Sequence, residues 1–194
     1  MYKTEKRKQK IISVLKSRQK SLRIVLENIH DPHNVSAIFR TCDAVGVSRA
    51  SLLYYIEKFP KIGKKSSASA FKWVERDKFK EVKSCYEKLR EEGFQIYASA
   101  IVEDAVSIYD IDLTKKTALV LGNEHRGVSE EAALYADKKF IIPMKGMVQS
   151  LNVSVAAAVI LYEAFRQRQK KGMYVGSEYS PEELNEMVNN WCNK

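Results

Sequence analysis

Two polar residues, Ser150 and Asn152, lie between an apolar run at residues 140–142 and a long apolar segment, after a loop that contains Pro and Gly. This order predicts a buried strand, a loop at the carboxyl edge of a sheet and a helix beginning near Asn152. In open α/β sheets, ligands bind at that edge. A side-chain oxygen at a helix start can equally be an ordinary N-cap, so this segment alone leaves a purely structural role open.

A second strand-to-helix segment covers residues 26–47, LENIHDPHNVSAIFRTCDAVGV. An apolar face predicts a helix over residues 35–45, and Gly46 is placed to end it. Asn34 and Arg40 bracket the first turns of this helix. They are therefore a second pair of polar residues near a strand end.

A third segment, residues 118–131, reads ALVLGNEHRGVSEE. A short apolar strand stops at Gly122, and a helix is predicted to start at Ser129. The spacing of the glycines around Glu124 is that of a P-loop, but Val128 stands where a P-loop needs the lysine that reaches the phosphates. A nucleoside triphosphate site is therefore poorly supported, and the absence of GxGxxG argues against a dinucleotide site.

Taken together, the three segments resemble the SpoU family of RNA ribose 2'-O-methyltransferases, within the class of knotted methyltransferases. The match runs from about residue 26 to residue 174, and its motifs are the Asn34 to Arg40 helix, GNEHRG and IIPMKGMVQSLNVSVA. Within the family, the chain is most similar to members that methylate the D-loop guanosine at position 18 of tRNA. Relatives that act on ribosomal RNA usually carry an additional N-terminal substrate domain, whereas the first strand here is predicted near Arg23.

The resemblance implies S-adenosylmethionine as cofactor, held mainly by main-chain groups of three loops that follow strands. It also implies a deep C-terminal trefoil knot and a homodimer built around the helix from Asn152. A knot is rare enough that periodicity would not have suggested one. The implied cofactor residues are Ser99, Leu121, Gly122, Asn123, Glu124, Ile142, Met144, Ser150 and Leu151.

The implied catalytic residue is Arg40, to which the family assigns general-base action on the ribose 2'-hydroxyl. A guanidinium pKa above about 12 makes neutral arginine scarce. Arg40 could instead grip an RNA phosphate and the developing alkoxide, while the phosphate or water takes the proton. The sequence leaves both versions open. Asn34 would orient Arg40 or the ribose, Glu124 would hold the cofactor loop, and Ser150 and Asn152 would complete the pocket.

The charge of the chain is concentrated at its N-terminus. The formal net charge is +9, and the first twenty residues carry +7 of it. Apolar residues at positions 11, 12, 14 and 15 favour a docked basic helix that binds RNA, although a solvated terminus remains an alternative. A transit peptide fits less well because the segment is rich in Lys and poor in Ser. The residues expected to contact RNA are Lys6, Arg7, Lys8, Lys10 and Arg18, then Lys64 and Lys65 in a loop, and Arg166 and Arg168 on the long helix.

Cysteine and histidine usage narrows the class of protein further. Three cysteines and three histidines form neither a CxxC pair nor a metal spacing, so we expect no disulfide framework, no metal and a reducing cytoplasm. No apolar run reaches about 18 residues, so we expect no membrane span.

Alternating strands and helices predict an α/β fold, a mostly parallel sheet with helices on both faces. The expected organisation is a basic helical extension over residues 1–20, a knotted methyltransferase domain over residues 21–171 and a helical extension over residues 172–194. The last helix, from Ser180, must pack on its own domain, on the N-terminal helix or on a partner subunit. Strands are expected over residues 23–28, 51–56, 94–98, 117–121 and 139–142, and the central helices over residues 35–45, 77–92, 129–136 and 152–170.

The leading functional hypothesis is a tRNA ribose methyltransferase. The alternatives are an RNA-binding protein of the same fold without catalysis and a ribosomal RNA methyltransferase. The joint presence of Asn34, Arg40, Glu124, Ser150 and Asn152 favours an enzyme, because a protein without activity would be free to lose them.

Overall fold

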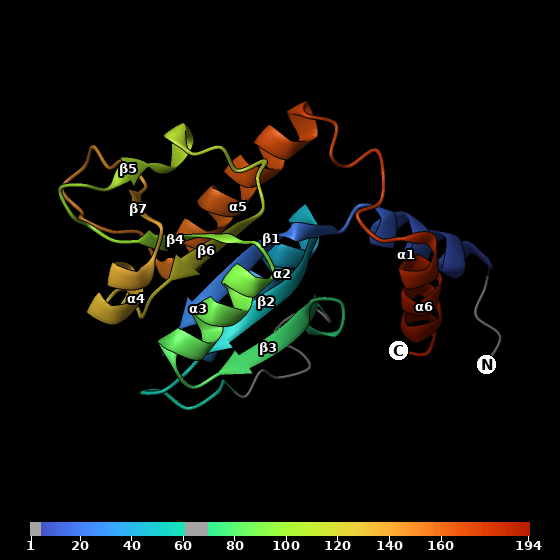
Figure 1. Cartoon of the computed structure of the whole chain (residues 1–194), viewed down its shortest axis with the longest axis horizontal. Coiled ribbons are helices and arrows are strands. Elements are labelled where there is room, and N and C mark those ends of the chain that lie inside the picture. The colour runs from blue at the N-terminus through green and yellow to red at the C-terminus, as the bar shows by residue number, and fades with distance from the viewer. Residues whose placement is uncertain (1–4, 61–69) are drawn as a thin grey trace.

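The computed structural model of the chain describes residues 5–60 and 70–194 (Figure 1). Within these residues a seven-stranded sheet has the order β3-β2-β1-β6-β4-β7-β5, and all neighbouring strands are parallel. The predicted α/β class with a parallel sheet is confirmed. The strands are β1 (Gln19–Glu27), β2 (Val47–Leu53), β3 (Glu75–Phe79), β4 (Gln95–Ser99), β5 (Val106–Ser107), β6 (Thr117–Leu121) and β7 (Lys138–Ile141).

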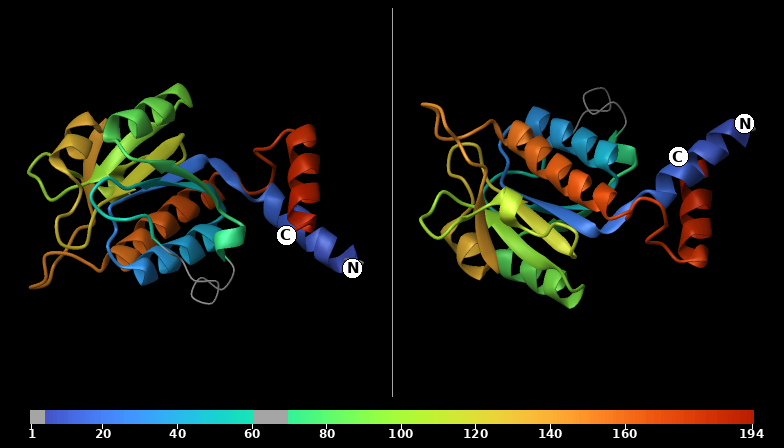
Figure 2. Two further views of the ribbon diagram at one scale, coloured as in Figure 1. Left: turned by 90° about the horizontal axis from the view of Figure 1, so that it is seen from below. Right: turned by 90° about the horizontal axis from the view of Figure 1, so that it is seen from above.

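Helices cover both faces of the sheet (Figure 2). α2 (Pro32–Val45) and α5 (Val153–Lys170) lie side by side on one face, and α3 (Val82–Glu91) and α4 (Glu130–Tyr135) lie on the other. Strand β1 serves both layers: Leu22, Ile24 and Leu26 belong to the core under α2 and α5, whereas Val25 belongs to the core under α3 and α4. This alternation is why a central parallel strand reads as an uninterrupted apolar run.

The boundaries of α2 follow from local capping. Asp31 accepts a hydrogen bond from the main-chain N–H of His33, and Pro32 occupies the first turn, where its missing N–H does no harm. The helix therefore starts three residues before the predicted Val35. Gly46, at φ 85°, ends it as predicted.

Two helices form a separate pair beside the sheet. α1 (Glu5–Lys16) and α6 (Pro181–Cys192) pack together near both termini, at the right of Figure 1. Ile11, Leu15, Val188 and Trp191 form the centre of their contact. The C-terminal helix thus packs its buried residues on the N-terminal helix, and a capping box between Ser180 and Glu183 forms its first turn.

Several elements differ from the sequence prediction, among them β2, which spans Val47–Leu53 where a strand over residues 51–56 was expected. β3 and the short β5 were not foreseen, and the helix expected from Asp77 begins only at Val82, because residues 75–79 pair with β2. β3 was missed because its sequence, ERDKF, lacks apolar alternation. Its acids instead pair with arginines of the neighbouring strands, as when Asp77 accepts from Arg23 at 3.0 Å.

β1 begins at Gln19, inside the segment that was assigned to the N-terminal extension. Two short 3-10 helices, Ala70–Lys72 and Ile108–Asp110, complete the described elements. No helix of residues 5–60 and 70–194 is long and apolar enough to cross a membrane. The trefoil knot stays a prediction.

Candidate active site at the carboxyl edge of the sheet

The loop after β6 is shaped by its two glycines. A Cβ added to Gly122 would lie 2.1 Å from the main chain of Gly127 and Val128, so no side chain fits there. Gly127 has φ +69°, a left-handed conformation that favours glycine. The spacing that resembled a P-loop therefore makes a tight turn folded back on the end of β6.

Asn123 fixes this turn from within. Its side-chain oxygen accepts hydrogen bonds from the N–H groups of His125 and Arg126, at 2.9 and 3.1 Å. Its amide donates to the carbonyl of Asn28 at 2.7 Å, which joins the turn to the end of β1. The Asn123 side chain is buried and its main-chain carbonyl accepts from the N–H of Gly127 at 2.8 Å, so Asn123 serves mainly to hold the turn together.

Glu124 joins the second motif to the first. Its carboxylate accepts from the main-chain N–H groups of His30 (2.8 Å) and Asp31 (3.2 Å), and from the side-chain amide of Asn34 (2.8 Å). Burial alone would raise the pKa of Glu124, but these hydrogen bonds outweigh it and hold the pKa below its usual value. Glu124 is therefore an anionic anchor for the segment that opens α2.

Asn152 joins the third motif to the first. Its amide donates to the side-chain oxygen of Asn34 at 3.2 Å, and its own oxygen caps α5 by accepting from Ser154 and Val155. The N-cap role that the sequence left open is thus real, and it coexists with a contact to another motif. Glu124, Asn34 and Asn152 form one chain of hydrogen bonds that joins the three motifs, and we call these residues the edge triad.

Arg40 and Ser150 lie outside this chain of bonds. Arg40 is exposed on α2, six residues after Asn34, which places it about a third of a turn away around the helix axis. Within the described residues, no hydrogen bond or ion pair engages either side chain. A cationic side chain free of such partners can bind a phosphate or a developing alkoxide.

The predicted cofactor residues follow three different strands, and their burial varies. Ser99 ends β4 and is half-buried, Leu121 and Gly122 are buried at the end of β6, and Ile142 and Met144 are half-buried after β7. Ser150 is exposed and Leu151 half-buried at the far end of the same loop. The structure thus offers mainly main-chain groups here. Among the described residues, no cluster of His, Cys, Asp and Glu could hold a metal ion.

Some of the predicted RNA contacts are placed where RNA could reach them. Lys6, Arg7, Lys8 and Lys10 are exposed on α1. The Arg166 side chain is 63% exposed but is paired with Glu163 at 2.7 Å. Lys64 and Lys65 lie outside the described residues.

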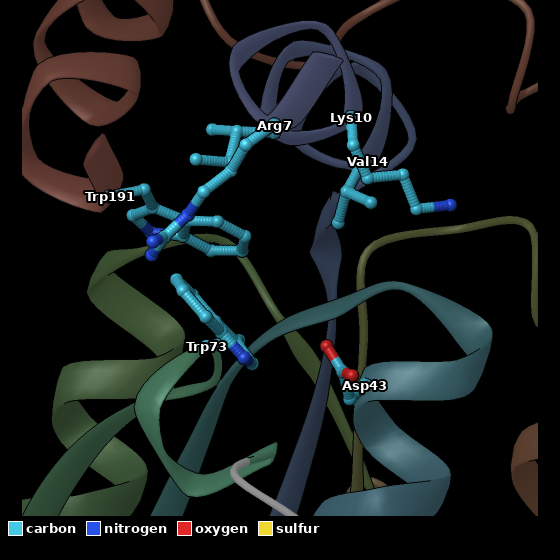
Figure 3. A pocket seen from close by; sticks show the side chains of 7 residues that line it. Arg7, Lys10, Val14, Asp43, Trp73 and Trp191 are labelled. Carbon is cyan, nitrogen blue, oxygen red and sulfur yellow. The ribbon is translucent and has the colours of Figure 1, made fainter. Parts of the chain in front are cut away.

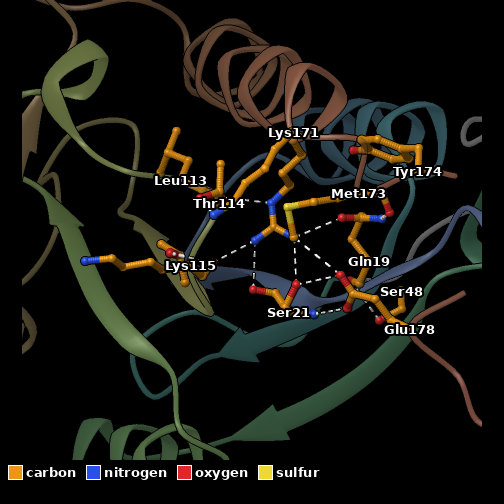
Figure 4. A network of polar contacts seen from close by, with 12 residues as sticks. Gln19, Ser21, Ser48, Leu113, Thr114, Lys115, Lys171, Met173, Tyr174 and Glu178 are labelled. Atoms are coloured by element: carbon orange, nitrogen blue, oxygen red, sulfur yellow. Dashed lines mark hydrogen bonds and ion pairs between the residues drawn. The ribbon is translucent and has the colours of Figure 1, made fainter. Parts of the chain in front are cut away.

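Arg168 requires a correction. Its side chain is fully buried, and its five N–H groups all have acceptors within 3.0 Å (Figure 4). The acceptors come from the start of β1 and from the segment before β6, and Glu178 lies 3.7 Å away. A guanidinium with no free donor does not bind an RNA phosphate, so Arg168 is a structural clamp. The acceptors are the side chains of Gln19 and Ser21 and the carbonyls of Ser21, Leu113 and Lys115.

Arg18 requires the same correction. It is 1% exposed, pairs with Asp43 and donates to the carbonyl of Val47 at 3.0 Å. Its guanidinium also lies 5.2 Å from the ring of Trp191. Arg18 therefore fixes α1 and α6 to the body of the protein. Its place in a basic run concealed this, because charge counting does not distinguish a buried cation from an exposed one.

Sequence reasoning missed Asn28. Its φ is 49°. Its side-chain oxygen accepts hydrogen bonds from the N–H groups of Tyr55, Ile56 and Glu57, and its main-chain carbonyl accepts one from the Asn123 side chain. An Asn directly after a buried strand was the available signal, since Asn is one of the few residues that tolerate a left-handed conformation.

Fold and site together define a class: a parallel α/β protein whose ligand site is built from strand-end loops. The particular family follows from comparison, because residues 21–162 match the model of the SpoU rRNA Methylase family. The chain belongs to that family.

Similar proteins cover most of its length. It is 47% identical over 191 residues to the tRNA (guanosine(18)-2'-O)-methyltransferase of Thermus thermophilus, spanning 98% of each chain. It is 42% identical over 166 residues to the Escherichia coli K12 enzyme of the same name, covering 86% of this chain and 72% of that one. Among solved structures, the Aquifex aeolicus TrmH/SpoU tRNA modifying enzyme superposes with a TM-score of 0.91 at 43% identity, covering 97% of this chain and 96% of the other.

Proposed function

We propose that this chain is an S-adenosylmethionine-dependent tRNA (guanosine(18)-2'-O)-methyltransferase. The observation that carries the proposal is the edge triad, in which one residue from each motif meets the others at the carboxyl ends of β1 and β6 and the start of α5. Relatives with this name match the chain at 42–47% identity over most of its length. A solved structure supports the choice of cofactor. An SpoU methyltransferase from Streptomyces viridochromogenes, 26% identical with a TM-score of 0.70, was crystallised in complex with AdoMet.

The residues present suit this cofactor. Gly122 lets the turn after β6 close tightly on the strand end, and the loop after β7 runs half-buried past Ile142 and Met144. Main-chain N–H and carbonyl groups can hold an adenosine and an amino acid without added charge. When bound, S-adenosylmethionine supplies the electrophilic methyl group.

The protein's part in the reaction is to position and stabilise. Alignment of reactants can contribute about 7 to 11 kcal/mol. The Asn34 side chain donates a hydrogen bond to Glu124 and accepts one from Asn152. These two bonds fix the Asn34 amide, which can then orient the ribose or Arg40. Arg40 keeps its charge, grips an RNA phosphate and stabilises the alkoxide, while the phosphate or water accepts the 2'-hydroxyl proton. Ser150 completes the pocket.

The enzyme acts as a homodimer in this proposal. Val155 and Tyr162 lie seven residues apart on α5 and are 48% and 52% exposed. A spacing of seven places them on one face, which a second copy could cover. Light scattering at micromolar concentration should give twice the chain mass, and a monomeric mass would exclude this arrangement. Because its substrate is tRNA, we place the enzyme in the cytoplasm.

The direct test is mass mapping of ribose methylation after incubation with tRNA transcript and S-adenosylmethionine. We expect one methyl group, on guanosine 18. A matched tRNA with dG18, which lacks only the accepting 2'-hydroxyl, should gain none. Methylation of ribosomal RNA fragments instead would show that the substrate is ribosomal RNA. Binding of tRNA without methylation would favour an RNA-binding protein without catalysis.

A further inference from the structure

A pocket at the other end of the molecule from the edge triad has no part in the function described above. It lies between α1, α6 and the end of α2, with a volume of about 280 Å³ (Figure 3). That volume falls just below the range of about 300–1,000 Å³ typical of sites for drug-sized ligands. The pocket therefore suits a single ring system and not a molecule as large as the methyl donor.

Both tryptophans of the chain line this pocket. The ring centroids of Trp73 and Trp191 are 4.8 Å apart at 44°. Trp73 is half-buried, and Trp191 is 3% exposed. The Trp191 Nε1 atom is buried, and no acceptor for its N–H lies in the described part of the chain. The pocket therefore combines aromatic surface with a buried donor that lacks a partner.

The remaining lining is mainly cationic and apolar. Arg7 and Lys10 come from the same face of α1 as Ile11 and Val14, three to four residues apart. Lys194 does not line the pocket but lies beside the two rings, with its Nζ 5.4 Å from the Trp191 ring centroid and 5.9 Å from that of Trp73. These cations would repel a cationic ligand and attract an anionic one.

One carboxylate, that of Asp43, also lines the pocket. One of its oxygens is held by Arg18, so its charge is compensated while the other oxygen can still accept a hydrogen bond from an amino group. Aromatic surface, an acceptor and surrounding cations are the combination that single-stranded nucleic acids use, since bases stack on the rings and phosphates meet the cations.

We propose that this pocket binds one unstacked nucleobase of the RNA, stacked on Trp73, while Arg7 and Lys10 contact the flanking phosphates. The inference rests on the proposed function only in taking tRNA as the RNA. It gives α1 and α6 a specific role, because the pocket exists only where these two helices meet the end of α2.

Intrinsic fluorescence tests the proposal on the unaltered protein, because both tryptophans lie in the pocket. Titration with tRNA should quench the emission in a saturable way. Polyphosphate, which carries the charge but no bases, should bind and leave the emission nearly unchanged. Equal quenching by both, or none by tRNA, would overturn the proposal.

Variants add a second readout. Trp73→Ala should weaken tRNA binding about 5- to 150-fold, the usual range for loss of one stacked base. The salt dependence should stay the same, because no phosphate contact is lost. Trp73→Phe keeps an aromatic ring and should recover most of the affinity. If Trp73→Ala binds tRNA as tightly as the wild type, or if Trp73→Phe is equally impaired with an unchanged melting temperature, stacking is excluded.

Lys10→Ala and Lys8→Ala form a matched pair on α1, since both remove one exposed cation but only Lys10 lines the pocket. Lys10→Ala should raise the tRNA concentration needed for half-maximal quenching more than Lys8→Ala does; equal effects would contradict the pocket. Methylation mapping of the wild type separates this inference from the proposed function. Methylation of guanosine 18 without quenching would contradict only the proposal that the pocket binds a base. Quenching without methylation would contradict only the proposed function.

Discussion

The two ends of β1 use polar side chains in opposite ways. At the carboxyl end, the edge triad links the three motifs through three side chains that are half-buried or exposed, and Arg40 has no partner among the described residues. At the amino end, Arg168 is fully buried and all its donors are used. At the carboxyl end, some hydrogen-bonding groups remain available to a ligand. At the amino end, the donors of Arg168 are all used within the protein. Free hydrogen-bonding capacity separates Arg40, the arginine that we propose takes part in the reaction, from Arg168, which stabilises the fold.

The largest expected effect concerns the free arginine. Arg40→Ala should lower the rate of methyl transfer by at least about 10²- to 10³-fold, the usual loss when a group stabilising transition-state charge is removed. Binding of S-adenosylmethionine, measured by calorimetry, should stay within a few fold. Turnover within about tenfold of the wild type would show that Arg40 has no role in the reaction, and the proposed difference between Arg40 and Arg168 would then fail.

The structural arginine should fail in the opposite way. Arg168→Ala leaves several buried acceptors without donors and should lower the free energy of unfolding by about 3 kcal/mol. Arg168→Lys should rescue little, because an ammonium cannot reproduce the fork of five donors. Urea unfolding measures both. Arg166→Ala is the matched control two residues away: it should weaken tRNA binding and lower stability much less than Arg168→Ala, because the Arg166 side chain is exposed and Glu163 keeps its bond from Gln167. Equal stability losses in both variants would contradict the assignment.

Asn152 separates positioning from capping within the edge triad. Asn152→Ser keeps an oxygen that can cap α5 but loses the amide that donates to Asn34. We expect it to slow methyl transfer while the melting temperature hardly changes. Asn152→Ala should slow transfer equally and also destabilise by about 1 kcal/mol. If Asn152→Ser turns over like the wild type, the contact with Asn34 has no role in the reaction.

The smallest expected effect is a pH dependence carried by Glu124. Its folded pKa lies below the usual value near 4.5, so its contribution to stability is present above that value and is lost as pH falls through the folded pKa. Glu124→Gln should therefore cost stability at pH 7 and show less further loss between pH 5 and pH 3. The measurement is the urea midpoint of the wild type and of Glu124→Gln at several pH values across this range. Parallel curves for the two proteins would mean that Glu124 is not held by its hydrogen bonds.

Much of the carboxyl edge could be predicted from sequence because its signals are local. The start of α5 at Asn152, the end of α2 at Gly46 and the strand before Gly122 each depend on neighbouring residues, and each appears as expected. Asn34 donates to Glu124 across 90 positions, and Asn152 donates to Asn34 across 118 positions. The family resemblance grouped these residues, but only the fold shows how they connect.

The amino edge could not be predicted, because its signals are long-range. Arg168 meets Gln19 across 149 positions, and Arg18 meets Asp43 across 25. Nothing in the local sequence separates Arg168 from Arg166, since both are cations near the end of an amphipathic helix. β3 was missed for a related reason: its acids replace apolar residues by pairing with arginines on β1 and β2.

The division of labour between the two ends is tested most directly by single-turnover methylation measured over a range of tRNA concentrations. Replacing Lys6 and Lys8 on α1 together by alanine should raise the tRNA concentration needed for half-maximal rate and leave the maximal rate near that of the wild type. Asn34→Ala should lower the maximal rate even at saturating tRNA. A maximal rate that falls equally in both proteins, or that recovers fully in Asn34→Ala at high tRNA, would contradict the assignment of chemistry to the carboxyl edge.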